Sequence, residues 1–411
     1  MAVIRPFNAV RPTRDKVSLI ASRSYQSYTP AEREARLDHN PYSFLHIVNP
    51  GYKYQKVING EERFELVRNR YQEFKEDGIF IKDKVPSLYI YKIIDRDFQE
   101  FTGIIGASSA EDYQNNIIKK HEDTIEYRET LFKDYLKTVG FNAEPVLLTY
   151  EENETISSIM KKVMASRAEY EFTTTYRDTH YLWPITGTQE IDTIVKEFEQ
   201  MPELYIADGH HRSASSVLLN HDMSSSKDSN INESYKYFMS YYISEENLKI
   251  HQFNRLVRDL NGLSKEEFLI KLDMVFRIEN RGTQQYRPSK KHHFSMYLDG
   301  HFYSLYLRKR YRNFNNPLEA LDTQILYDIL LNPILGIEDV RNDKRLSYIH
   351  GKNDLVDVKY AVDAKEFEVG FGMLPITMEE LKSIADNNLT MPPKSTYIEP
   401  KLRSGICIYE F

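Results

Sequence analysis

The stretch LYIADGHHRSASSVLLN, residues 204–220, places ionisable side chains between two apolar segments. Residues 204–207 predict a short buried strand, and Gly209 predicts a turn. A helix is predicted to follow, beginning near Arg212 or Ser213. A helix N-terminus presents N–H groups and a partial positive charge, so we expect an anion to bind there. The planar guanidinium of Arg212 would hold the same phosphate or carboxylate.

Three other side chains of this turn are candidates for catalysis. Asp208 would cap the helix, orient a histidine or a metal ion, or accept a proton, and His210 and His211 would contact the ligand. A purely structural role is equally consistent with the pattern, with Asp208 as a cap and both histidines bonded to the backbone.

A second group recurs at three- and four-residue steps and predicts one helix from about 110 to 138. Its members are Ile118, His121, Ile125, Arg128, Phe132 and Tyr135. His121 and Arg128 would then lie within an apolar stripe, with Glu122 beside them in the segment KKHE. Buried charges must be paired or functional, so all three are candidates. The alternative is an Arg128–carboxylate pair beside a solvated run of charges.

A third segment, MPPKSTYIEPKLRSG at 391–405, is broken by three prolines that forbid a helix. We expect an extended loop that displays cations and hydroxyls suited to a phosphorylated ligand. The candidate side chains are Lys394, Ser395, Thr396, Lys401, Arg403 and Ser404. An ordinary surface loop remains the alternative, because the segment lacks a glycine-rich phosphate cradle.

The composition excludes several classes of protein. The 54 basic and 61 acidic residues give a net charge of −7, which argues against broad nucleic-acid binding. The single cysteine, Cys407, excludes an intramolecular disulfide and a cysteine-cluster metal site, and no metal ligands are assigned. The chain shows no apolar run of bilayer length and no signal core, so a cytoplasmic protein is expected.

The apolar patterns predict a mixed α+β protein of two or more parts. Strands are expected at 44–48, 87–94, 101–106, 145–149, 204–207, 236–243, 248–253, 293–298 and 301–307, and at the C-terminus. Helices are expected at 30–39, 110–138, 189–200, 264–274, 317–332 and 377–386. The polar segment 221–234 suggests a boundary, giving an α/β region at 1–225, an α+β region at 235–390, and a loop and strand at 391–411 that contribute to the site.

Several of these segments together resemble one known family. In order along the chain they are NPYSFLH, KKHE, LYIADGHHR, FNRLVRDLNGLS, PILGI followed by DKR, and MPPKSTYIEPKLRSG. Over essentially its whole length the chain resembles the bacterial and archaeal domain-of-unknown-function family 1015. Ser213 stands where that family usually has an aromatic residue.

The turn also resembles the phosphate-binding turn of the ParB/sulfiredoxin-like superfamily, at Asp208, Gly209, His211 and Arg212. That superfamily includes nucleotide hydrolases and free-serine kinases, so the resemblance implies a ParB/sulfiredoxin-like core and a small-molecule kinase. Such a kinase would use ATP or ADP with Mg²⁺ to phosphorylate a hydroxyl metabolite, with free L-serine the leading acceptor. Glu122 or Asp208 would accept the hydroxyl proton. The alternatives are a nucleotide-binding regulatory or DNA-associated protein, and a metabolite-binding protein without turnover.

Overall fold

The computed structural model describes residues 1–225, 233–350, 352 and 355–411, and these divide into two compact units. The first unit contains Met1–Lys120, Thr124–Leu248 and Pro400–Phe411. The second contains His121–Asp123 and Lys249–Glu399. The chain therefore enters the second unit after residue 248 and returns to the first for its last twelve residues.

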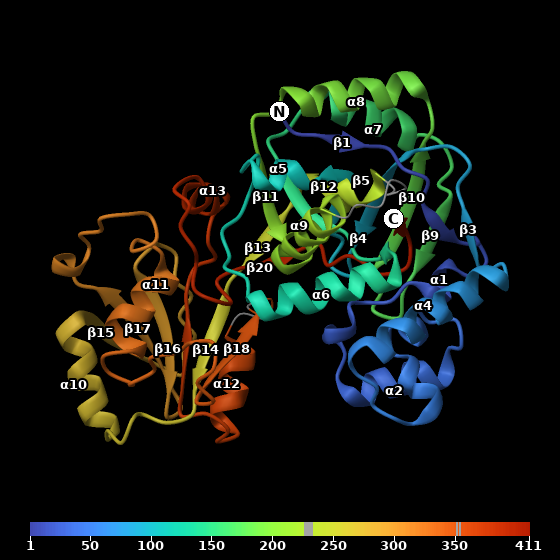
Figure 1. Cartoon of the computed structure of the whole chain (residues 1–411). Helices are drawn as coiled ribbons and strands as arrows, with labels where there is room; N and C mark the ends of the chain where they lie inside the picture. The colour runs from blue at the N-terminus through green and yellow to red at the C-terminus, as the bar shows by residue number, and fades with distance from the viewer. Residues whose placement is uncertain (226–232, 351, 353–354) are drawn as a thin grey trace. The chain divides into compact units, whose positions relative to one another are not determined.

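The first unit is built on a nine-stranded sheet (Figure 1). Its strands are β1 (Ile4–Arg5), β4 (Leu88–Ile94), β5 (Glu100–Ser109), β6 (Ile118–Lys119), β8 (Val146–Tyr150), β9 (Tyr170–Thr173), β10 (Thr179–Ile185), β11 (Leu204–Asp208) and β12 (Tyr237–Ser244). The order is β6-β11-β8-β12-β5-β4-β10-β9, with β1 paired to β5. The pairs β6–β11 and β8–β12 are parallel and the others antiparallel, so the sheet is mixed.

Helices cover this sheet and extend beyond it. They are α1 (Val17–Ile20), α2 (Pro30–His39), α3 (Leu45–Val48), α4 (Gly60–Glu76), α5 (Ala110–Gln114), α6 (Glu126–Val139), α7 (Glu154–Met164), α8 (Thr188–Gln200) and α9 (His210–Ser224). Buried residues of α7 and α8, such as Ile156 and Ile194, share a core with alternate residues of β8, β11 and β12. α9 packs against β8 and β12 and against α5 and α6.

The last twelve residues are held in the first unit by strand pairing and by ion pairs. β21 (Tyr409–Glu410) pairs with β7 (Phe141–Asn142), near the short pair β2 (Val10–Pro12) and β3 (Phe80–Lys82). The Glu410 carboxylate accepts hydrogen bonds from Lys75 at 2.6 Å, Lys82 at 2.9 Å and the Tyr71 hydroxyl at 2.9 Å. Burial opposes ionisation, but these three donors hold the pKa of Glu410 below its usual range.

Glu410→Gln is expected to lower the free energy of unfolding by about 1–3 kcal/mol at pH 7, because it removes a half-buried, charge-assisted network. A carboxyl with a lowered native pKa stabilises the fold above its unfolded pKa and loses that contribution as the pH falls through the native pKa. The difference between wild type and variant should therefore shrink below about pH 4.5. Urea unfolding at pH 7 and pH 3.5 measures it, and a constant difference would contradict the assignment.

The second unit has a six-stranded antiparallel sheet in the order β15-β17-β16-β19-β14-β18. Its strands are β14 (Phe253–Val257), β15 (Phe276–Gly282), β16 (His293–Leu298), β17 (His301–Leu307), β18 (Leu346–His350) and β19 (Val369–Gly372), with β13 (Lys249–His251) and β20 (Tyr397–Glu399) paired separately. Its helices are α10 (Lys265–Val275), α11 (Asp322–Leu326) followed by a π-helical turn at Tyr327–Leu331, α12 (Val356–Asp363) and α13 (Met378–Asp386). Two apolar clusters form its core.

The mixed α+β class predicted from the sequence is confirmed, and most predicted elements lie within a few residues of the observed ones. Two are wrong. Residues 45–48 form helix α3 instead of a strand, and the helix predicted from 110 to 138 is divided into α5, β6 and α6. Part of the predicted boundary segment 221–234, at 226–232, lies outside the described residues, and the two units separate between residues 248 and 249.

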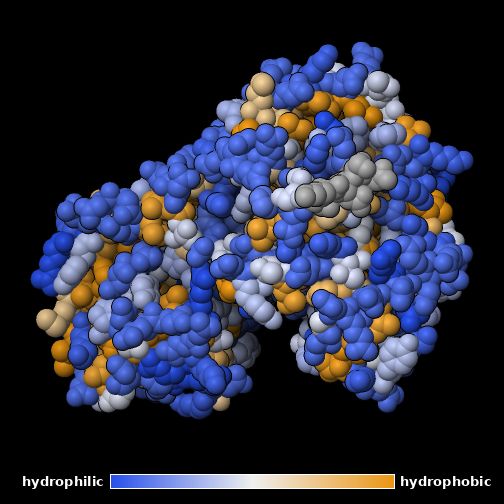
Figure 2. All heavy atoms as spheres, in the orientation of Figure 1, coloured by the Kyte–Doolittle hydropathy of each residue, from blue (hydrophilic) through white to orange (hydrophobic). Residues whose placement is uncertain are grey.

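On the face in view, hydrophilic side chains predominate and hydrophobic ones are scattered among them (Figure 2). Among the described residues, no helix is both long enough and apolar enough to span a lipid bilayer.

Candidate functional site

The site predicted from the sequence lies in the first unit where β11 ends and α9 begins. Asp208 is the last residue of the strand, and α9 begins at His210, two to three residues before the predicted start. His210, His211 and Arg212 therefore all belong to the first helical turn, whose N–H groups have no acceptor within the helix. His210 is buried and His211 is partly exposed.

Gly209 makes this tight connection possible. Its φ of 104° and ψ of 28° lie in a region of backbone conformation that residues with a side chain rarely adopt. A Cβ atom at this position would lie 3.2 Å from Cζ of Arg212, so a larger residue would also press on the guanidinium. Glycine thus serves both the turn and the placement of Arg212.

Asp208 lies between two cations. One carboxylate oxygen accepts a hydrogen bond from Arg212 Nη2 at 2.7 Å, and the other accepts one from Lys401 Nζ at 3.0 Å. Desolvation favours the neutral acid, but Lys401 and Arg212 outweigh it and hold the pKa of Asp208 well below its usual range. The side chains of Asp208, Arg212 and Lys401 are 37, 25 and 43% exposed, so a ligand can reach all three.

The second turn of α9 is built from small residues. Ser213, Ser215 and Ser216 are buried, and their hydroxyls donate to backbone carbonyls three or four residues earlier in the helix. Arg212 also donates to the carbonyl of Pro145, directly before β8. Ser213, which stands where the family usually has an aromatic residue, is fully buried.

Two neighbours of Lys401 serve as anchors for the C-terminal segment. Arg403, with a side chain 5% exposed, donates to Asp178 at 2.6 Å, and Ser404 donates to Glu144 at 2.6 Å. Residues 391–405 form no helix, as expected, but Tyr397–Glu399 is strand β20 and not part of a loop, and the expectation that the segment displays all six side chains is wrong. Ser395, Arg403 and Ser404 are buried.

Several predicted site residues belong to the second unit. His121 is buried, and its carbonyl accepts a hydrogen bond from the Met391 N–H at 2.9 Å. Glu122 next to it is exposed and lies outside any helix. Lys394 has a φ of 58° and its ammonium lies 5.5 Å from the ring centre of Phe253.

Ser395 and Thr396 follow Lys394 in the second unit. The Ser395 hydroxyl donates to the Pro392 carbonyl at 2.6 Å, and Thr396 is partly exposed.

Arg128 instead belongs to α6 of the first unit and is exposed, so the predicted apolar stripe through His121 and Arg128 is wrong. Within the first unit, the structure brings Lys401 together with Asp208 and Arg212.

Sequence reasoning did not identify Asp178, Glu144 or Pro145 as partners of the site. Each lies far along the chain from the residue that it contacts, and no local pattern marks it.

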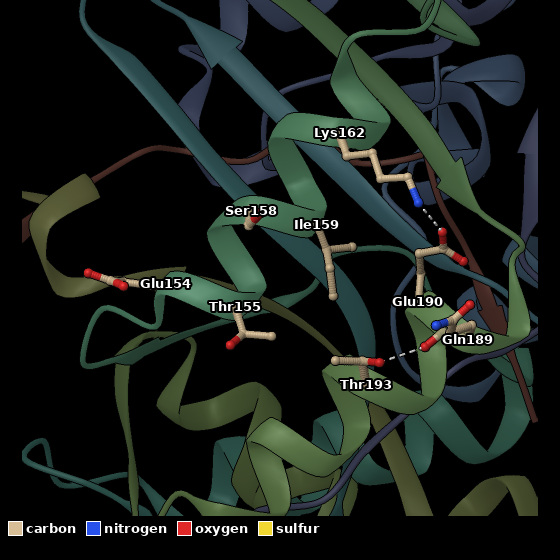
Figure 3. Close-up of a pocket in the computed structure, with 8 residues that line it drawn as sticks. All are labelled: Glu154, Thr155, Ser158, Ile159, Lys162, Gln189, Glu190 and Thr193. Carbon is tan, nitrogen blue, oxygen red and sulfur yellow. Dashed lines mark hydrogen bonds and ion pairs between the residues drawn. The ribbon is translucent and has the colours of Figure 1, made fainter.

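A separate pocket of about 480 Å³ lies between α7 and α8 (Figure 3). Lys162 and Glu190 form an ion pair at 2.8 Å on its wall, and the Thr193 hydroxyl donates to the Gln189 carbonyl. None of the predicted site residues lines it.

Within the described ranges, no three histidine, cysteine, aspartate or glutamate side chains are grouped closely enough to hold a metal ion.

Comparison with known sequences identifies the family. The profile described as "Protein of unknown function (DUF1015)" matches residues 4–324. The chain belongs to the DUF1015 family. The match contains the Asp208–Arg212 turn of this DUF1015 protein, whereas Lys401 lies beyond it. The sequence matches no curated protein.

Three solved structures are similar to the DUF1015 chain at low identity. A free serine kinase variant in complex with AMP is 11% identical with a TM-score of 0.37, over 73% of this chain and 90% of that one. A conserved hypothetical protein from Pyrococcus furiosus is 12% identical with a TM-score of 0.36, over 73% and 93%. C-terminally truncated SbnI from Staphylococcus aureus is 13% identical with a TM-score of 0.39, over 74% and 85%. We draw no functional conclusion from similarities of this size.

Proposed function

We propose that this protein is a nucleotide-dependent phosphotransferase that acts on a small hydroxyl metabolite, with free L-serine as the leading acceptor. The observation that carries the proposal is the arrangement of Arg212 and Lys401 on either side of Asp208 at the start of α9. The ParB/sulfiredoxin-like resemblance of this turn is consistent with the proposal and itself remains a prediction.

The charges of the site favour an anion. Two cations face one carboxylate, which leaves an excess of one positive charge, and the N-terminus of the fifteen-residue helix α9 adds to it. The side chains of Arg212 and Lys401 would turn from Asp208 to phosphate oxygens, with His211 beside them. Phosphoryl transfer depends mainly on positioning and charge neutralisation, which these groups can supply.

The side chain of Asp208 fits a role with Mg²⁺ and a nucleotide. Mg²⁺ in nucleotide sites is held by one or two carboxylates together with phosphate oxygens, and it supplies further charge neutralisation. When Arg212 and Lys401 turn to phosphate oxygens, the Asp208 carboxylate loses both of these partners, so we assign Asp208 to hold the cation. Proton acceptance by Glu122 remains a prediction from the sequence.

Phosphorus NMR tests the activity directly. Purified protein with Mg²⁺, L-serine and either ATP or ADP is expected to form O-phospho-L-serine, and an Arg212→Ala control should form less than a tenth as much. Serine is then replaced by other hydroxyl metabolites to define the acceptor. If no phosphorylated product appears above the control with either nucleotide, the kinase proposal fails. Calorimetric binding of nucleotide without product would favour the regulatory or metabolite-binding alternatives.

A further inference from the structure

A group of arginines and tyrosines lies in the first unit between the N-terminal segment and the β9–β10 hairpin. The guanidinium carbon of Arg23 is 4.6 Å from the ring centre of Tyr176 and 5.6 Å from that of Tyr28. That of Arg36, on α2, is 5.1 Å and 5.5 Å from the same two rings. We call Arg23, Arg36, Tyr28 and Tyr176 the Arg–Tyr patch.

The positive charge of the patch is only partly offset. Arg36 donates to the Thr175 hydroxyl at 2.7 Å, and in the described part of the chain neither Arg23 nor Arg36 forms an ion pair with a carboxylate. Glu32 is close enough for both arginines to act on it, but its carboxylate accepts the Thr29 N–H at 2.8 Å in the capping box of α2.

The geometry suits recognition of an oxyanion. A guanidinium lying against an aromatic ring uses its face for that contact and directs its N–H groups outward in its own plane. Such N–H groups form charge-assisted hydrogen bonds with phosphate and carboxylate oxygens. Both arginines are partly exposed, so such a group can reach them.

The patch is also close to the candidate site along the C-terminal segment. The Arg403 guanidinium lies 5.6 Å from the ring centre of Tyr176, and Arg403 is two residues from Lys401, which binds Asp208. Two residues of extended chain span at most about 7 Å. The C-terminal segment therefore links the patch to the Asp208 site within the same unit.

We propose that Arg23 and Arg36 form a second oxyanion-binding site, which takes a phosphate or carboxylate group. If the patch binds the far end of the ligand held at Asp208, this inference rests on the proposed function. Binding of an oxyanion at the patch does not depend on that function. A net charge of −7 for the chain favours a single small anion over an extended nucleic acid.

Isothermal titration calorimetry of the full chain tests the inference, with inorganic pyrophosphate and malonate as probes for phosphate and carboxylate. Arg23→Gln combined with Arg36→Gln is expected to weaken binding of at least one probe tenfold or more. Arg96→Gln is the matched control, because Arg96 is an exposed arginine of the same unit, and it should change neither affinity. Arg23→Lys combined with Arg36→Lys should give an intermediate loss of affinity, since lysine keeps the positive charge but lacks the planar guanidinium group.

The outcomes separate this inference from the proposed function. Loss of pyrophosphate or malonate binding in the Arg23/Arg36 variant supports the patch, even if Arg212→Ala leaves ATP binding intact and the kinase proposal fails. Binding of both probes at wild-type strength in the Arg23/Arg36 variant overturns the inference, as does failure of the wild type to bind either. Arg23→Gln alone guards against misfolding, because among the described residues the Arg23 side chain makes ring contacts but no hydrogen bond or ion pair.

Discussion

Replacing Arg212 with alanine is expected to weaken ATP binding by about 10- to 100-fold. A charge-assisted hydrogen bond contributes about 1.5–3 kcal/mol, and a tenfold change in affinity corresponds to about 1.4 kcal/mol. The variant also removes one of the two cations that bind Asp208, which reduces the excess positive charge of the site. Calorimetric titration with ATP and Mg²⁺ measures the change.

Two controls give this result its meaning. Arg212→Lys keeps the charge and should retain part of the affinity, and Arg128→Ala tests a predicted ligand residue that is exposed on α6. Because the Arg212 side chain is 25% exposed, the ligand-free variant should keep most of its thermal stability. Unchanged affinity would remove Arg212 from the phosphate site, and a severe loss of stability would assign it a structural role instead.

Replacing Asp178 with alanine is expected to lower the free energy of unfolding by about 3–5 kcal/mol. The change leaves the Arg403 guanidinium buried without its ion-pair partner, and a buried charge that loses its partner is strongly destabilising. Urea unfolding followed by circular dichroism gives the value. ATP affinity should fall as well, because Arg403 fastens the segment that carries Lys401.

The exposed pair Arg96–Asp97 provides the comparison for this prediction. Its side chains are 59 and 68% exposed, so Asp97→Ala should change stability by less than about 1 kcal/mol. Combining Asp178→Ala with Arg403→Met should recover part of the loss, since the unpaired charge is then gone. Equal effects of Asp178→Ala and Asp97→Ala would show that the buried pair contributes no more than a surface one.

The strand, turn and helix around Asp208 could be predicted because local signals agree there. The short apolar run predicts strand β11, the glycine predicts the turn at Gly209, and the helical pattern that follows predicts α9. The start of α9 was predicted two to three residues too late, because His210 and His211 carry no strong helix-start signal.

The single helix predicted over 110–138 failed because its apolar positions come from different elements that happen to be in phase. Ile118 belongs to β6, and Ile125 is exposed just before α6. Asn116, two residues after α5, has a φ of 57°, a conformation that asparagine tolerates better than most residues. The Gln-Asn-Asn sequence at 114–116 was the available signal against a continuous helix.

The ion pair between Lys401 and Asp208 could not be predicted from local pattern, because 193 residues separate its members. The sequence indicated that both segments carry suitable charges, and only the folded chain shows that Lys401, and not Arg403, faces the carboxylate. Arg403 and Lys401 have the same charge and nearly the same position in sequence. Their different environments follow from tertiary packing.

The return of residues 400–411 to the first unit has a consequence for the order of events during protein synthesis. Asp208 leaves the ribosome 193 residues before Lys401 does. At about 5–20 residues per second, that interval lasts roughly 10–40 s. Throughout it, the nascent first unit lacks β21, the Arg403–Asp178 pair and one of the two cations beside Asp208. A nascent chain therefore brings Lys401 to Asp208 only after the whole second unit has been synthesised.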